Sequence, residues 1–273
     1  MKQLFSNTDL NFIKTTILEA GERILKQAKI IVVHPEKAGG GTASLATQAD
    51  IDTENFLRKH LGKRFPDFGF YSEETYKQNA HELNKEYCWV VDPIDGTLNF
   101  SRGLPIFGNS VALFHNGKPV FGAIYFPHFK DYFWAVKGQG TFRNTTPIRV
   151  RKAQSDSGWY GSFDYWHISA ARDAAIGDII RKFKLESANM YSAVYHATRV
   201  AQGSFDFMTF INIALWDIGA GWILIEEAGG EFATLFTDEN RKQSGDPYHL
   251  WCVGGSKQIV NQLEPEVKRL IKL

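Results

Sequence analysis

The segment 89–99, WVVDPIDGTLN, constrains the fold of this chain more than any other. Asp92 and Asp95 stand at the end of an apolar, β-branched run, and Pro93 is expected to turn the chain out of a strand there. Two carboxylates at one strand end repel each other by about 4 kcal/mol at roughly 4 Å and an effective dielectric constant near 20. A divalent cation is the most direct way to offset that repulsion.

The size and charge of the chain narrow the classes of protein that it can belong to. Its 273 residues, 44% hydrophobic and 22% charged, suffice for one large α/β domain or two packed halves. We expect an N-terminal α+β half over 1–145 and a C-terminal α/β half over 146–273, packed as one unit because no linker separates them. A net charge of +1 argues against binding of a nucleic acid polymer. A tight acidic cluster would therefore be a local feature of this chain.

Nothing in the sequence predicts a membrane segment or a disulfide framework. No apolar run approaches the ~20 residues that span a bilayer, and the first residues lack the apolar stretch of a signal peptide. The two cysteines, Cys88 and Cys252, lie in no metal-binding motif, so two buried thiols are expected. These features favour a cytoplasmic protein without a membrane partner.

Hydrophobic periodicity predicts helices packed on a largely antiparallel sheet in the first half. The expected helices and loops are a helix capped by Thr8 or Asp9, a flexible loop over 34–43, a second helix over 47–61 with Ile51, Phe56 and Leu57 inward, and a polar loop over 77–86. The expected strands cover 68–72, 87–92, 107–115, 118–126 and 131–136, with a hairpin turn at Asn116-Gly117.

Strands and helices alternate in the second half. Strands are predicted over 157–163, 205–210 and 250–254. Helices are predicted over 169–183, over 192–202 with Gly203 beyond its end, from Trp216 to Gly229-Gly230, and over 256–273 with an interruption at Pro265.

Acidic residues occur at three points of the expected fold: Glu73-Glu74, Asp92 with Asp95, and Asp217. Each follows a predicted strand or begins a predicted helix, where α/β proteins build their sites. Oxygen ligands without Cys or His suit a hard cation such as Mg²⁺. The alternative is structural: Asp217 would only cap its helix, and residues 92–95 would only form a turn.

Four motifs in order give the sequence a family resemblance. Residues 92–100, DPIDGTLNF, resemble the first signature of the inositol monophosphatase family, and residues 216–221 running on to 227–230 resemble the second. Thr47-Gln-Ala-Asp50 and Glu73-Glu74 match two further family motifs. The resemblance implies an α/β fold, the five-layer α/β/α/β/α sandwich of the inositol monophosphatase and fructose-1,6-bisphosphatase type, and a homodimer.

The resemblance also implies lithium-sensitive, Mg²⁺-dependent hydrolysis of a small phosphate monoester, with two or three ions per site. Glu73, Asp92 and the carbonyl of Ile94 would hold one ion. Asp92, Asp95 and Asp217 would hold a second, and Glu74 an additional, weaker one. Two such cations can acidify water and neutralise phosphate charge, so no nucleophilic side chain is required.

The implied catalytic and substrate-binding roles follow the same motifs. Glu73 and Thr97 would orient and deprotonate the attacking water, supported by Asp50 and Thr47. The backbone N–H groups of Gly96 and Thr97 would receive the phosphate. The full implied substrate-binding set is Asp95, Gly96, Thr97, Ser192, Ala193, Phe210 and Asp217.

Two positions depart from the inositol-selective pattern. Phe210 stands where those members carry a glutamate that binds sugar-like hydroxyls, and Tyr191 stands at a family glycine. Myo-inositol monophosphate is therefore not expected to be the preferred substrate. Six aromatic residues either stack on a base, as in a 3'(2'),5'-bisphosphate nucleotidase, or belong to the core: Trp159, Phe163, Tyr165, Trp166, Tyr191 and Phe210.

Other functions stay open beside these. Fructose-1,6-bisphosphatase activity would use the same metal centre. A non-catalytic binding protein is disfavoured, because Glu73, Asp92, Asp95, Thr97 and Asp217 are all present.

Overall fold

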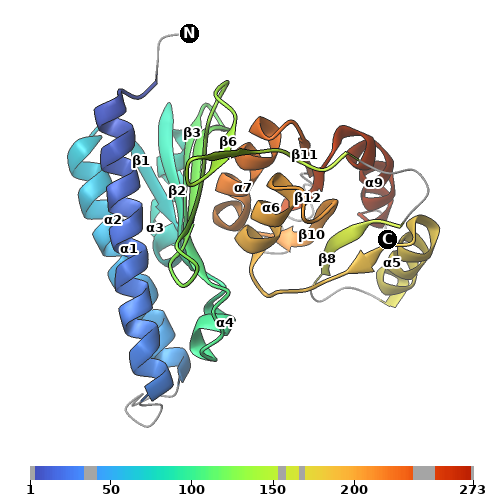
Figure 1. Ribbon diagram of the computed structural model, residues 1–273, viewed down its shortest axis with the longest axis horizontal. Coiled ribbons are helices and arrows are strands. Elements are labelled where there is room, and N and C mark those ends of the chain that lie inside the picture. The colour runs from blue at the N-terminus through green and yellow to red at the C-terminus, as the bar shows by residue number, and fades with distance from the viewer. Residues whose placement is uncertain (1–3, 34–41, 153–157, 166–169, 236–249, 272–273) are drawn as a thin grey trace.

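The chain folds into alternating layers of helix and sheet. The computed structural model describes residues 4–33, 42–152, 158–165, 170–235 and 250–271 (Figure 1). Helices α1 and α2 cover a seven-stranded sheet, α6 and α7 lie between this sheet and a five-stranded one, and α5 and α9 cover the far side (Figure 1). The predicted α/β fold class is confirmed, and these layers agree with the expected sandwich.

The first layer consists of α1 (Asn7–Val33) and α2 (Thr42–Arg64). Ser6, rather than Thr8 or Asp9, caps α1. Its hydroxyl accepts the Asp9 N–H at 3.1 Å, and the Asp9 carboxylate accepts the Ser6 N–H at 3.1 Å. The prediction was wrong because this reciprocal capping box starts the helix earlier than Thr8.

Helix α2 begins five residues before its predicted start at residue 47. Residues 42–43 of the predicted loop are therefore helical, and 34–41 lie outside the described residues. Phe56 and Leu57 are buried as predicted, but Ile51 is 37% exposed. Ile51 was misplaced because the buried side of this turn of α2 carries Asp50 instead.

The large sheet has the strand order β1 to β7. Its strands are β1 (Gly69–Ser72), β2 (Tyr87–Asp95), β3 (Gly108–His115), β4 (Lys118–Phe126), β5 (Asp131–Val136), β6 (Thr141–Arg143) and β7 (Thr146–Ile148). Only β1 and β2 pair in parallel. Asn116 and Gly117 both have positive φ, as the predicted hairpin turn requires. Strands β6 and β7 were not predicted.

The segment between β1 and β2 is helical rather than a plain polar loop. It forms η2 (Glu73–Thr75), α3 (Tyr76–Asn79) and η3 (Ala80–Asn84). The prediction over 77–86 missed these short turns because none of them buries a residue, so they leave no hydrophobic period.

Strand β2 does not end at Asp92. It continues through Pro93 to Asp95, and its pairing with β3 shifts register between Asp92, opposite Ser110, and Asp95, opposite Gly108. The prediction that Pro93 ends the strand was wrong because an irregularity of this kind accommodates a residue without an N–H. Helix α4 (Thr97–Ser101) follows directly.

The chain beyond β7 builds the middle helices and the smaller sheet. Its helices, among the residues that the structure describes, are α5 (Ala170–Phe183), α6 (Ala193–Ala201), α7 (Leu215–Glu227) and α9 (Lys257–Leu270). Its strands, in the order β11-β12-β10-β8-β9, are β8 (Tyr160–Tyr165), β9 (Glu186–Ser187), β10 (Phe207–Ile213), β11 (Glu231–Leu235) and β12 (Leu250–Gly255). Strands β9 and β11 were not predicted.

Pro265 does not interrupt the last helix. Helix α9 runs through it, with Ile259, Leu263 and Val267 buried against the smaller sheet. The predicted break was wrong because this continuous apolar face outweighs the hydrogen bond that proline removes.

Candidate active site

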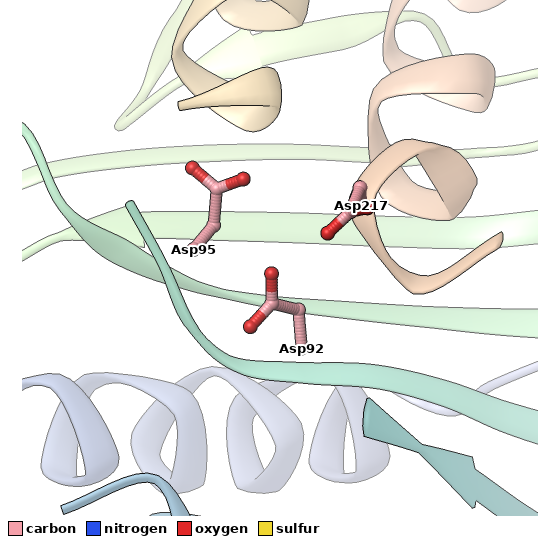
Figure 2. Close-up of side chains that lie close together, drawn as sticks. All are labelled: Asp92, Asp95 and Asp217. Carbon is pink, nitrogen blue, oxygen red and sulfur yellow. The ribbon is translucent and has the colours of Figure 1, made fainter. Parts of the chain in front are cut away.

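Three aspartates from distant parts of the chain meet between β2 and the start of α7. One oxygen of each of Asp92, Asp95 and Asp217 lies within 4.8 Å of the others (Figure 2). Asp92 and Asp95 are buried, and Asp217 is half-buried. The register shift of β2 and the first turn of α7 together place these carboxylates in one space (Figure 2).

Glu73 belongs to the same cluster. It follows β1, whose last residue Ser72 pairs with Val91 on β2, so Glu73 lies beside the end of β2. Burial, and next the charge of Glu73, raise the pKa of Asp92 and that of Asp217 well above the ordinary value. Burial and then Glu74 raise the pKa of Glu73 itself to about 7. Four carboxyl groups therefore interact strongly.

Asp50 approaches the cluster from α2. Burial, followed by the charges of Glu73 and Glu74, raises its pKa to about 9. The buried Oδ1 atoms of Asp50 and Asp92 have no hydrogen-bond partner among the described residues. Buried, unpaired carboxylate oxygens are costly unless a cation or a proton compensates them.

Asp95 is held by the first turn of α6. Its Oδ1 accepts the Ser192 hydroxyl, and its Oδ2 accepts the N–H groups of Ala193 at 3.0 Å and Val194 at 3.4 Å. Burial raises the pKa of Asp95 to about 6, against these hydrogen bonds, which lower it. Ser192 and Ala193 are thereby placed next to the aspartate cluster.

Asp217 caps a helix and also lies in the acidic cluster. Its Oδ2 accepts the Ala214 N–H at 3.2 Å and so caps α7. It also lies in the aspartate cluster. The prediction that Asp217 caps its helix is therefore correct. Helix capping alone does not explain why Asp92 and Asp95 lie beside it.

Comparison with known proteins identifies the family of this chain. The model of the inositol monophosphatase family matches residues 7–262. The chain belongs to the inositol monophosphatase family. Members of this family are phosphatases, hydrolases acting on phosphoric monoesters, which confirms the predicted enzyme class.

Two relatives and one solved structure illustrate the match. Inositol monophosphatase 2 of Saccharomyces cerevisiae is 32% identical over 217 residues, covering 72% of this chain and 71% of that protein. A fructose-1,6-bisphosphatase/inositol-1-monophosphatase of Aquifex aeolicus is 32% identical over 221 residues, covering 79% and 82%. The crystal structure of inositol monophosphatase II from Staphylococcus aureus shares the fold, with a TM-score of 0.76, 24% identity and coverage of 98% and 97%.

The turn after β2 is shaped by Gly96. Its φ is +81°, and a Cβ atom there would lie 2.7 Å from the carbonyl oxygen of Ile106. Thr97 follows, and its hydroxyl donates to the carbonyl of the buried Ile94 at 2.9 Å. The first signature thus brings Ile94, Gly96 and Thr97 to the edge of the aspartate cluster.

Three further predicted site residues were not placed in the aspartate cluster: Glu74, Phe210 and Thr47. Glu74 is only half-buried, and burial followed by Glu54 raises its pKa. Phe210 is buried in the apolar cluster between the middle helices and the smaller sheet, with its ring 5.7 Å from that of His196. The side chain of Thr47 lies outside the described residues.

Most of the described candidate aromatic residues are core residues. Trp159 and Phe163 belong to the cluster beneath α5 and α9, and Trp159 stacks on Phe183. Tyr191 is 47% exposed, whereas Trp166 and the side chain of Tyr165 lie outside the described residues. The core alternative therefore holds for Trp159, Phe163 and Phe210.

One structural residue of the site was missed by the sequence reasoning. The buried Asn99 donates through Nδ2 to the carbonyls of Ile106 and Met190, both at 2.8 Å. The Met190 N–H in turn donates to Nε2 of His196 at 2.9 Å, and burial lowers the pKa of His196 to about 4. Asn99 and His196 thus fix the segment that leads into Ser192. The only signal was Asn99 within the first signature, and its long-range partners could not be inferred.

In the part of the chain that the structure describes, none of the helices is long and apolar enough to cross a bilayer.

Proposed function

We propose that this phosphatase hydrolyses a small phosphorylated metabolite with Mg²⁺ bound at the aspartate cluster. The single observation that carries the proposal is the convergence of Asp92, Asp95 and Asp217, with ligand atoms within 4.8 Å of one another. Hard oxygen donors and unpaired buried oxygens suit Mg²⁺ better than a soft metal.

The family resemblance assigns these donors to separate ions. Glu73, Asp92 and the carbonyl of Ile94 would hold one ion. Asp92, Asp95 and Asp217 would hold a second, and Glu74 a third, weaker one. Such ions supply positive charge that polarises the phosphoryl group and acidifies water.

The protein groups around this centre would position and deprotonate the attacking water. The Thr97 hydroxyl donates a hydrogen bond to the Ile94 carbonyl, so the lone pairs of its oxygen can accept a hydrogen bond from water. Glu73 would take the proton of that water. Asp50 and Thr47 would support Thr97 in this role.

Backbone donors and the start of α6 would bind the substrate. The N–H groups of Gly96 and Thr97, at the start of α4, would receive the phosphate. Asp95, Ser192 and Ala193, which already form one hydrogen-bonded group, would contact the leaving group together with Asp217. Phe210, expected from the sequence in this set, is left out of it because its side chain is buried in the core.

Two sugar-like phosphate esters are the candidate substrates. The relatives' names support inositol phosphate, although Phe210 and Tyr191 predict that myo-inositol monophosphate is not the preferred substrate. The Aquifex aeolicus name adds fructose 1,6-bisphosphate as a second candidate. The buried positions of Trp159 and Phe163 give no support to a base-stacking pocket. The proposal includes inhibition by lithium, a homodimer and a cytoplasmic location, as the family resemblance implies.

The test is phosphate release by protein first stripped of metal with EDTA. Three substrates are compared at increasing Mg²⁺: inositol 1-phosphate, fructose 1,6-bisphosphate and adenosine 3',5'-bisphosphate. We expect no release without metal, saturable release with Mg²⁺ from one of the first two, and inhibition by Li⁺. Absence of Mg²⁺-dependent release from all three would refute the proposal.

A further inference from the structure

Glu54 is a buried carboxylate outside the proposed metal ligands. It lies on α2 four residues after Asp50, hence on the same side of the helix, and is 1% exposed. A carboxylate this deeply buried requires strong partners, because its desolvation is costly.

Those partners belong mainly to the turn that carries Glu73. Glu54 Oε2 accepts the backbone N–H of Glu74 at 3.1 Å, and Oε1 accepts the Thr75 hydroxyl at 2.6 Å. Both donors are in η2, the three-residue turn Glu73–Thr75. One carboxylate on α2 therefore fixes two consecutive residues next to Glu73.

Arg58 closes the network. Its Nη2 donates to Glu54 Oε1 at 2.8 Å and to the Thr75 hydroxyl at 2.5 Å. Its guanidinium lies 4.3 Å from the ring centroid of Phe70, on the strand that leads into η2. The network therefore joins α2, β1 and η2.

The η2 turn follows β1 directly, whose last residue Ser72 pairs with Val91 on β2. Ser72, at its N-cap, makes no side-chain capping hydrogen bond, and none of the three residues of η2 is fully buried. Neither hydrophobic burial nor a local cap fixes this turn, so its position depends on the pairing of β1 with β2 on one side and on the bonds to Glu54 on the other.

A negative charge at position 54 has an electrostatic cost. After burial, the charge of Glu54 is the next cause that raises the pKa of Glu74, and it adds to those that raise the pKa of Glu73. A neutral side chain would avoid this repulsion, but it could not accept the three hydrogen bonds that Glu54 accepts.

We infer that Glu54 is a positioning residue that holds Glu73 in the metal-binding arrangement. The inference rests on the proposed function, since it assigns Glu73 to the metal centre. Glu54 itself does not bind the ion but acts through η2, as residues behind metal ligands commonly do.

The test uses Glu54→Gln, which keeps the shape of the side chain but replaces one acceptor oxygen with an NH₂ group. Metal-free protein is titrated with Mn²⁺, with free ion measured by electron paramagnetic resonance, and the Mg²⁺ dependence of phosphate release is measured in parallel. We expect Mn²⁺ affinity to fall about 10- to 100-fold and the half-saturating Mg²⁺ to rise by a similar factor. The kcat at saturating metal should change much less.

Glu82→Gln is the matched control. Glu82 also accepts a backbone N–H of this region, that of Phe70 at 3.3 Å, and pairs with His81 and Lys85. Among the described residues, these side-chain partners lie outside both η2 and the aspartate cluster. It should leave Mn²⁺ affinity unchanged. Equal Mn²⁺ affinities for Glu54→Gln, Glu82→Gln and the wild type would overturn the inference.

A second pair of variants covers the case in which Glu54→Gln does not fold. Thr75→Val removes the hydroxyl that donates to Glu54, whereas Thr75→Ser keeps it. Weakened Mn²⁺ binding in the valine variant, restored in the serine variant, supports the inference, and identical binding in both contradicts it. Failure of the proposed function is distinguishable, because the wild type itself would then show no Mg²⁺-dependent phosphate release.

Discussion

At the scale of single residues, the aspartates of the cluster differ in how the protein satisfies them. Asp95 accepts three hydrogen bonds from the start of α6, whereas the Oδ1 atom of Asp92 has no partner among the described residues. Both are buried carboxylates, yet only Asp95 also holds a helix end. Substituting each one should therefore separate metal binding from stability.

Asp95→Asn and Asp92→Asn should both lower kcat, by about 100-fold or more, because each removes a charge from the metal centre. Their effects on the free energy of unfolding without metal should differ. Asp95→Asn loses an acceptor for the α6 donors and should cost about 1–3 kcal/mol. Asp92→Asn removes repulsion and should be neutral or stabilising. The measurements are kinetics and urea unfolding in EDTA; rates of Asp95→Asn within tenfold of wild type would contradict the account.

The pH dependence of the metal-free protein follows from the raised pKa of Glu73. Burial and Glu74 raise it to about 7 from an ordinary value of 4.5, so the folded state binds more protons than the unfolded state between these values. This contribution to stability is fully present below pH 4.5 and is lost as the pH rises through 7.

Unfolding in EDTA should therefore become easier between pH 5 and pH 8, by about 1.4 kcal/mol for each unit by which the pKa is raised. Saturating Mg²⁺ should remove most of this dependence. Urea midpoints measured across this range test the prediction, and an increase in stability with pH in EDTA would be inconsistent with it.

The acidic residues of the site could be located from sequence because each stands at the end of an apolar run or the start of a helix. Asn99 and Glu54 could not, since their partners lie 91 and about 20 residues away along the chain. Hydrogen bonds between distant segments depend on packing, and a single sequence does not encode them as a pattern.

At the scale of elements, the least dependable predictions were that a helix or strand ends or breaks at a proline. Pro93 lies within β2 at a shift of register, and Pro265 lies within α9. In both cases the surrounding tertiary structure outweighs the local preference of proline. Long elements with a clear apolar period, such as α1 and β4, were predicted well, whereas three-residue strands such as β6 carry too little pattern to be recognised.

Gly96 tests whether the turn after β2 is fixed by sterics. Gly96→Ala adds a Cβ atom 2.7 Å from the Ile106 carbonyl oxygen at a φ of +81°, whereas Gly117→Ala adds one at +76° with nothing within 4 Å. Left-handed backbone costs alanine about 1 kcal/mol at both sites.

Gly96→Ala should therefore reduce the free energy of unfolding by clearly more than Gly117→Ala and should also lower kcat. Thermal and urea unfolding of the two variants give the comparison. Equal destabilisation by Gly96→Ala and Gly117→Ala would mean that the backbone after β2 can shift away from the added Cβ atom at no energetic cost. The turn would then not fix the position of Thr97.

At the scale of the whole molecule, the site lies where the large sheet meets the middle helices. Asp92 and Asp95 come from the large sheet, while Asp217 comes from α7, which packs against β3 and β4 on one side and β11 and β12 on the other. The family resemblance, rather than periodicity, predicted this layered arrangement.

Metal binding should therefore stabilise the molecule as a whole. Ligand present at 100 times its dissociation constant adds about 2.7 kcal/mol to the free energy of unfolding. Mg²⁺ should raise the midpoint of thermal unfolding above its value in EDTA, and Asp92→Asn should lose most of this increase. An equal increase in that variant would indicate that the stabilising ions bind elsewhere.

The central claim, that the convergent acids form the metal centre of a phosphatase, is tested most directly by anomalous X-ray diffraction from crystals grown with Mn²⁺. The account predicts anomalous peaks in coordination contact with Asp92, Asp95 and Asp217, and a further one beside Glu73. Ordered Mn²⁺ bound only at other places, with these four carboxylates free of metal, would contradict it.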